Sequence, residues 1–187
     1  MPRSAKAARW LGVAALVALT FALGYWGARQ YRVQPVASEA SPENRGYQPG
    51  VTPEYVLVYI GSAGCAVCQD EYLPGYIDII STQLREDAKA DSATYRSVGI
   101  AIDFVADVGI EHLSSISSFG EIISGSSWTN SGVLKYVWDT FPGEPSTPQV
   151  VVVRRDVMMS QTSMSVQNER VVRRVVGLPA IQRWAES

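Results

Sequence analysis

The 187-residue sequence predicts an α/β domain, with a central mixed β-sheet flanked by helices, behind an N-terminal membrane-spanning segment. Three observations predict this architecture. An apolar run near the N-terminus is long enough to cross a bilayer, a strand–helix–strand succession follows it, and two further strands with a closing helix end the chain. The composition, 47% apolar and 18% charged, is that of a folded chain and not of a disordered one.

The membrane-spanning segment is predicted over residues 10–28. Thr20 is its only hydrophilic side chain, and as a helix it would span about 28 Å, close to the hydrocarbon thickness of a bilayer. A cleaved signal peptide is the alternative, but its apolar core is usually only about 7–15 residues long. The basic residues of 1–9 favour a cytoplasmic N-terminus. We therefore expect a single-pass signal anchor in an inner or plasma membrane, with the domain facing the periplasm or exterior.

Residues 29–50 are predicted to form a flexible linker, because this stretch is rich in Pro, Gly and Ser and has no periodic apolar pattern. The folded domain is then expected over residues 51–187. Charge separates these parts of the chain: residues 1–32 carry five basic side chains and no acidic one, whereas residues 33–187 carry 11 basic and 18 acidic ones. Because a nucleic-acid-binding surface has to be cationic, we expect no nucleic-acid partner.

The first half of the domain predicts a strand, a helix and a second strand. Residues 54–60 and 98–104 are short apolar, β-branched runs suited to buried strands. Between them, residues 66–88 have helical character, with a kink expected at Pro74-Gly75.

The second half predicts a helical insertion, a hairpin and a closing helix. The insertion covers residues 107–143 and contains an apolar face at helical spacing. Residues 149–154 and 169–176 are β-branched enough for two strands, joined by a long hairpin loop around residues 156–168. A terminal helix is expected after Gly177, with a proline in its first turn.

The two cysteines of the chain, Cys65 and Cys68, form one C-x-x-C between the first strand and the first helix. Free backbone N–H groups and the helix dipole stabilise an anion there, which favours a thiolate at Cys65. Cys68 lies one turn further along and can attack a mixed disulfide formed at Cys65. The pattern predicts a catalytic pair of nucleophile and resolving thiol, with no metal and no cofactor.

This arrangement resembles the thioredoxin-like superfamily, in particular its membrane-anchored thiol–disulfide oxidoreductases. The resemblance is carried by the strand–loop–CxxC–helix unit, by Pro74 in the helix, by Thr147-Pro148 directly before a strand, and by Gly177 before the last helix. It implies that Pro148 is a cis-proline beside the redox pair and that Thr147 binds the backbone of the substrate. The implied partners are protein thiols or disulfides of envelope or secreted proteins, and a membrane or soluble partner that recycles the cysteines.

The sequence also departs from the family pattern. Tyr59 stands six residues before the first cysteine, where the family's cytosolic thioredoxins carry a buried acid that assists proton transfer at the second thiol. Asp70 and Glu71 place negative charge close to the pair, so we expect Cys65 to be only moderately acidic. The single histidine, His112, is expected at the surface or partly packed in a helix.

Two other interpretations of the cysteines stay open. A copper-handling protein would use the same thiolates, because soft ligands select Cu(I). Alternatively, the pair forms a structural disulfide in a non-enzymatic interaction domain. Three methionines near the hairpin either form a thioether copper site or belong to a strand end and flexible loop; they are Met158, Met159 and Met164.

Overall fold

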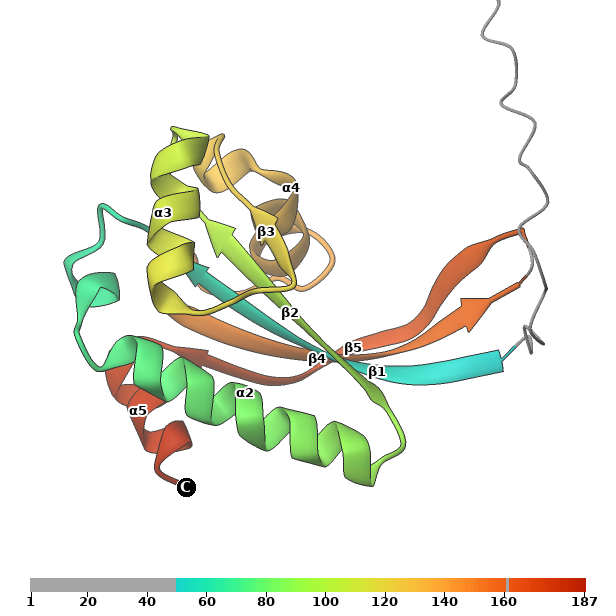
Figure 1. The fold of residues 1–187 in the computed structure, drawn as a ribbon. Coiled ribbons are helices and arrows are strands. Elements are labelled where there is room, and N and C mark those ends of the chain that lie inside the picture. Colours follow the sequence, from blue (N-terminus) through green and yellow to red (C-terminus); the bar gives the residue numbers. More distant parts are fainter. Residues whose placement is uncertain (1–49, 161) are drawn as a thin grey trace, which may run out of the picture. The chain divides into compact units, whose positions relative to one another are not determined.

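The computed structural model describes residues 50–160 and 162–187 (Figure 1). The predicted cytoplasmic N-terminus, the membrane anchor of residues 10–28 and nearly all of the linker therefore lie outside the described residues. Among the helices of the described part, none is long and apolar enough to cross a membrane.

The described chain alternates strands and helices, with short helical turns between them. In chain order the elements are β1 (Gly50–Gly61), η1 (Ala66–Gln69), α2 (Leu73–Ala90), β2 (Thr94–Ala101), α3 (Ala106–Ile116), β3 (Glu121–Ile123), η2 (Ser127–Thr129), α4 (Ser131–Val133), η3 (Leu134–Trp138), β4 (Gln149–Met159), β5 (Met164–Val176) and α5 (Leu178–Ala185). The turns η1 and η2 are 3₁₀-helical, and η3 is a π-helical turn that continues α4.

The strands form one mixed sheet in the order β3-β2-β1-β4-β5. β1 and β2 pair in parallel, as do β2 and β3, whereas β4 pairs antiparallel to both β1 and β5. The predicted mixed sheet flanked by helices is thus confirmed. The short edge strand β3 was not predicted, because three residues are too few for a recognisable pattern.

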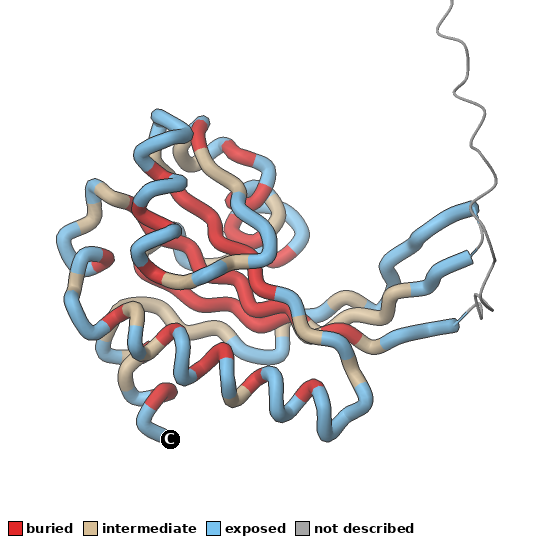
Figure 2. The backbone as a smooth tube through the Cα atoms, viewed as in Figure 1, coloured by how far each residue is buried: buried red, intermediate tan, exposed pale blue. Residues whose placement is uncertain are grey.

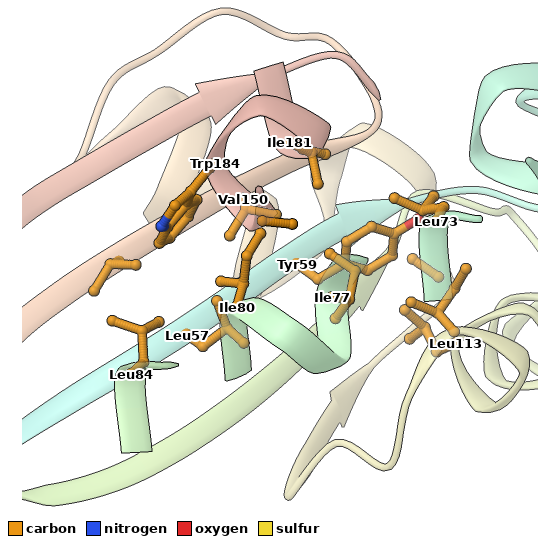
Figure 3. Packing of buried hydrophobic residues seen from close by; sticks show 14 residues of the cluster. Leu57, Tyr59, Leu73, Ile77, Ile80, Leu84, Leu113, Val150, Ile181 and Trp184 are labelled. Carbon is orange, nitrogen blue, oxygen red and sulfur yellow. The ribbon is translucent and has the colours of Figure 1, made fainter. Parts of the chain in front are cut away.

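Helices cover both faces of the sheet because β1, its central strand, is apolar on both sides. Leu57 and Tyr59 point into the core shared with α2, α3 and α5 (Figure 3). Val56, Val58 and Ile60 point into the opposite core, beneath α4 and η3. Figure 2 shows the resulting band of buried residues through the middle of the sheet.

The helix predicted over residues 66–88 is divided in the structure. The short turn η1 holds the CxxC, Asp70 is extended, and α2 begins at Leu73. Pro74 lies in the first turn of α2 and does not kink it. Its missing N–H costs nothing at that position, since first-turn amides have no partner within the helix.

The hairpin has longer strands and a shorter loop than the sequence predicted. Most of the loop expected over residues 156–168 is strand, and β4 and β5 pair until Met159 lies opposite Met164. The distal hairpin extends beyond the helical layers and is largely exposed (Figures 1 and 2). It lacks the continuous apolar pattern used to predict buried strands, so cross-strand pairing was not evident from the sequence.

Candidate functional site

The CxxC lies in the loop that leaves the carboxyl end of β1. This loop is held by Asp103, which lies within the strand predicted over residues 98–104 but follows β2 in the structure. One carboxylate oxygen accepts a hydrogen bond from Ser62 Oγ at 2.9 Å, and the other accepts one from the Ala63 amide at 3.2 Å. The Cys65 amide donates to the Ser62 carbonyl at 3.2 Å. Asp103 thereby fixes the backbone from which the first cysteine projects.

Cys65 is the more accessible thiol and caps the start of η1. Its Sγ accepts a hydrogen bond from the Cys68 amide at 3.3 Å. Partial burial would raise the pKa of Cys65, but hydrogen bonds from the side chains of Cys68 and Thr147 and from the Cys68 and Val67 amides outweigh it and lower the pKa. The stabilisation comes from these local donors, and a four-residue turn adds little dipole to them.

Cys68 is the hidden thiol of the pair and has no exposed surface. Burial, together with its hydrogen bond to Cys65, raises the pKa of Cys68 to about 12. The arrangement therefore favours a thiolate at Cys65 over one at Cys68, which stays protonated at neutral pH. These are the protonation states needed by an attacking and a resolving cysteine.

The segment implied to bind substrate lies against Cys65, although 82 positions separate them in the chain. The Thr147 carbonyl oxygen is 3.7 Å from Cys65 Sγ, and the Thr147-Pro148 peptide bond is cis, as the resemblance implied. Pro148 is buried, and its carbonyl accepts a hydrogen bond from the Gly177 amide at 2.8 Å. The structure thus brings all four predicted site residues together; their roles remain predictions.

Arg174 of β5 is hydrogen-bonded to residues around the Thr147-Pro148 segment and was not identified from the sequence. Its guanidinium donates to Gln149 Oε1 at 2.8 Å, to the Tyr136 carbonyl at 2.9 Å and to the Phe141 carbonyl at 2.8 Å. Gln149, adjacent to Pro148, is fully buried and donates in turn to the carbonyls of the preceding loop. The Arg174 side chain therefore joins β4, β5 and the insertion next to Thr147-Pro148.

Tyr59 and His112 lie on the buried side of the site. His112 is only 7% exposed, so the expectation of a surface or partly packed position is wrong: α3 packs its buried face, including this ring, against the sheet. The Tyr59 hydroxyl is 3.3 Å from His112 Nε2. The position of Tyr59 before the CxxC was a signal in the sequence, whereas nothing near His112 indicated its partner.

The other metal-binding candidates do not gather at this site. In the described part of the chain, no three His, Cys, Asp or Glu side chains are grouped as metal ligands. The methionines of the hairpin are exposed, and Met159 and Met164 face each other near its tip.

Comparison with known proteins found no matching family model and no matching curated protein. A solved structure of a thiol-disulfide oxidoreductase from Bacteroides fragilis NCTC 9343 is similar over 71% of this chain and 80% of that chain, with 12% sequence identity and a TM-score of 0.40. The mixed sheet flanked by helices, with a CxxC at the carboxyl end of β1, fits a thioredoxin-like fold.

Proposed function

We propose that this protein is a thiol–disulfide oxidoreductase that exchanges disulfides with protein substrates through Cys65 and Cys68. The asymmetry of the two thiols carries the proposal. Cys65 is accessible and has a lowered pKa, whereas Cys68 is buried directly behind it with a raised pKa. A structural disulfide has no need of one thiol that ionises readily and one that does not.

In the reducing direction, the Cys65 thiolate attacks one sulfur of a substrate disulfide. A mixed disulfide forms, and the other substrate sulfur leaves as a thiolate that takes a proton from water. Cys68 then attacks Cys65 Sγ, which forms the Cys65–Cys68 disulfide and releases the second substrate thiolate. Two electrons pass from the cysteine pair to the substrate, and the same steps in reverse oxidise a substrate dithiol.

In the proposed mechanism, the carbonyl of Thr147 binds the substrate backbone. At 3.7 Å from Cys65 Sγ, it is an acceptor beside the point of attack. An extended substrate segment that donates an amide to this oxygen would present its disulfide to Cys65. Substrates are therefore protein disulfides in locally extended, accessible segments.

The proposal includes a membrane tether that holds the domain on the outer face of an inner or plasma membrane. The apolar run of residues 10–28 and the basic residues before it support this part. Clients would be envelope or secreted proteins, for which disulfide exchange is relevant. Protease protection of a C-terminal tag in intact and permeabilised cells tests the orientation; digestion only after permeabilisation of the inner membrane would contradict it.

Trapping tests the exchange chemistry. In the full chain, Cys68→Ser keeps the nucleophile but removes the resolving thiol, so mixed disulfides with substrates should accumulate and disappear on reduction. Cys65→Ser is the matched control and should trap far less, since Cys68 is buried. Equal trapping by both variants, or none by Cys68→Ser, would refute the proposed mechanism.

A further inference from the structure

A chain of three buried groups leads away from the resolving cysteine. Cys68 and Tyr59 have no exposed surface, and His112 is 7% exposed. The Tyr59 hydroxyl lies 3.3 Å from His112 Nε2, and burial together with the neighbouring Cys68 raises the pKa of Tyr59. Figure 3 shows the Tyr59 ring extending toward Leu73, at the start of the helix that follows the CxxC turn. The three groups come from η1, β1 and α3.

The position of Gly61 indicates how closely this chain is packed. A Cβ atom at Gly61 would overlap the Tyr59 hydroxyl, so a side chain there is incompatible with the observed ring position. Phe119 stacks on the ring at a centroid distance of 5.9 Å, and the His112 ring lies 6.2 Å from it. The Tyr59 ring is therefore held by contacts on several sides, with its hydroxyl at His112.

Resolution of a mixed disulfide requires Cys68 to lose a proton. Water has no access to the thiol, and burial holds its pKa at about 12, so almost none is ionised at neutral pH. A proton acceptor inside the protein would remove this obstacle, and general-base assistance of this kind contributes roughly 10²–10⁴-fold in rate.

We propose that Tyr59 and His112 form a proton relay for Cys68, in which the Tyr59 hydroxyl accepts the thiol proton as it donates its own to His112 Nε2. The relay rests on the proposed thiol–disulfide exchange and concerns its second step. As Cys68 attacks Cys65, the S–S bond to the substrate breaks and the substrate leaves as a thiolate. Tyr59 ends unchanged, and His112 holds the proton until it passes to solvent.

The surroundings of His112 allow its ring to accept a proton. Burial lowers the pKa of His112 below its ordinary 6.5, so the ring is neutral at pH 7, and with its proton on Nδ1 it presents a lone pair at Nε2. Asp103, after β2, is the neighbouring carboxylate whose charge favours the protonated ring. The other ionisable groups near the relay are Cys68 of η1, Cys65 before it, and Tyr59 itself.

Reaction of the reduced full-length protein with 5,5′-dithiobis(2-nitrobenzoate) separates the two steps. Attack by Cys65 releases one coloured thiolate at a rate proportional to reagent concentration. Resolution by Cys68 releases the second at a rate independent of it. Stopped-flow absorbance at high reagent concentration, from pH 5 to pH 8, therefore gives a pH profile for the Cys68 step alone.

Tyr59→Phe keeps the ring and removes only the relaying hydroxyl. We expect it to slow the second phase roughly 100-fold while changing the first by less than about 2-fold. The wild-type second phase should be level near neutral pH and fall at lower pH, as His112 becomes protonated. In His112→Gln it should instead change about 10-fold per pH unit, because the rate then follows the small ionised fraction of Cys68. A merely structural role would not produce this change of profile.

Tyr95→Phe is the matched control, because its hydroxyl is also part-buried but bonds to Ser81 at 2.8 Å on α2. Both phases should be unchanged in it. If Tyr59→Phe and His112→Gln retain the wild-type rate and pH profile of the second phase, the relay is wrong even though exchange is intact. If wild type shows no second phase, the exchange mechanism itself fails. Should His112→Gln not fold, Tyr59→Phe alone decides, since it must lose both the rate and the level region near neutral pH.

Discussion

Arg174→Met tests whether one half-buried guanidinium holds the Thr147-Pro148 segment in place. The substitution keeps an unbranched apolar stem and removes all hydrogen-bond donors. Three oxygens then lose their partner: Gln149 Oε1 and the carbonyls of Tyr136 and Phe141. The backbone of Gly143 packs directly against the guanidinium, so the substitution also leaves unfilled space there.

The expected loss of stability follows from these three bonds. A buried hydrogen bond contributes about 1 kcal/mol net, and bonds from a charged donor contribute more. Burial of the charge destabilises the folded state, as the lowered pKa of Arg174 indicates. Removing the charge therefore offsets part of the stability lost with the three hydrogen bonds. The net destabilisation should be about 3 kcal/mol, which for a domain of this size lowers Tm by about 10 °C.

Urea denaturation of wild type, Arg174→Met and the control Arg170→Met measures this value. Arg170 lies on the same strand but is exposed, so its replacement should change the free energy of unfolding by no more than about 0.5 kcal/mol. The displaced loop should also slow disulfide exchange below the unfolding transition. A difference between the two variants of less than about 1 kcal/mol would show that the guanidinium does not hold the segment.

Three further perturbations test the site. Asp103→Ala removes both anchors of the 61–65 loop and should cost about 2 kcal/mol in urea denaturation, while Asp107→Ala, outside these bonds, should cost less than about 0.5. Because the folded pKa of His112 is lowered, the unfolded chain binds its proton more tightly, so this residue makes the folded state lose stability as pH falls below about 6.5. His112→Gln should reduce that loss, and unchanged pH dependence of the unfolding free energy would contradict its burial as a neutral ring. Gly61→Ala should displace the tyrosine hydroxyl and slow the Cys68 step, with no further slowing in a Tyr59→Phe background if both act through that hydroxyl.

Local patterns were enough to predict the sheet core and the redox pair. Two thiols three positions apart between a strand and a helix define a chemical unit, and Thr147-Pro148 directly before a strand is a short, recognisable signal. The boundary at Leu73 was missed because the helix pattern continued across a segment in which Asp70 is extended. The length of the β4–β5 hairpin was missed because exposed strands show weak periodicity.

The remaining parts of the site depend on packing between distant segments. Arg174 is one of several arginines in β5, and only the register of that strand brings it to Gln149. His112 has no motif around it, and its contact with Tyr59 arises from the packing of α3 on the sheet. Neither pairing leaves a pattern that a single sequence reveals.

Replacing a buried acid by a tyrosine–histidine pair changes the electrostatics of proton transfer. A carboxylate beside Cys68 would have to be buried as an anion or be protonated with a raised pKa. Tyr59 and His112 are both neutral at pH 7, because burial raises the pKa of the first and lowers that of the second. The charge appears only while Cys68 reacts, when Asp103 stabilises the imidazolium. A neutral relay therefore keeps the resolving thiol buried without placing a permanent charge beside it, and its expected signature is loss of resolution in acid.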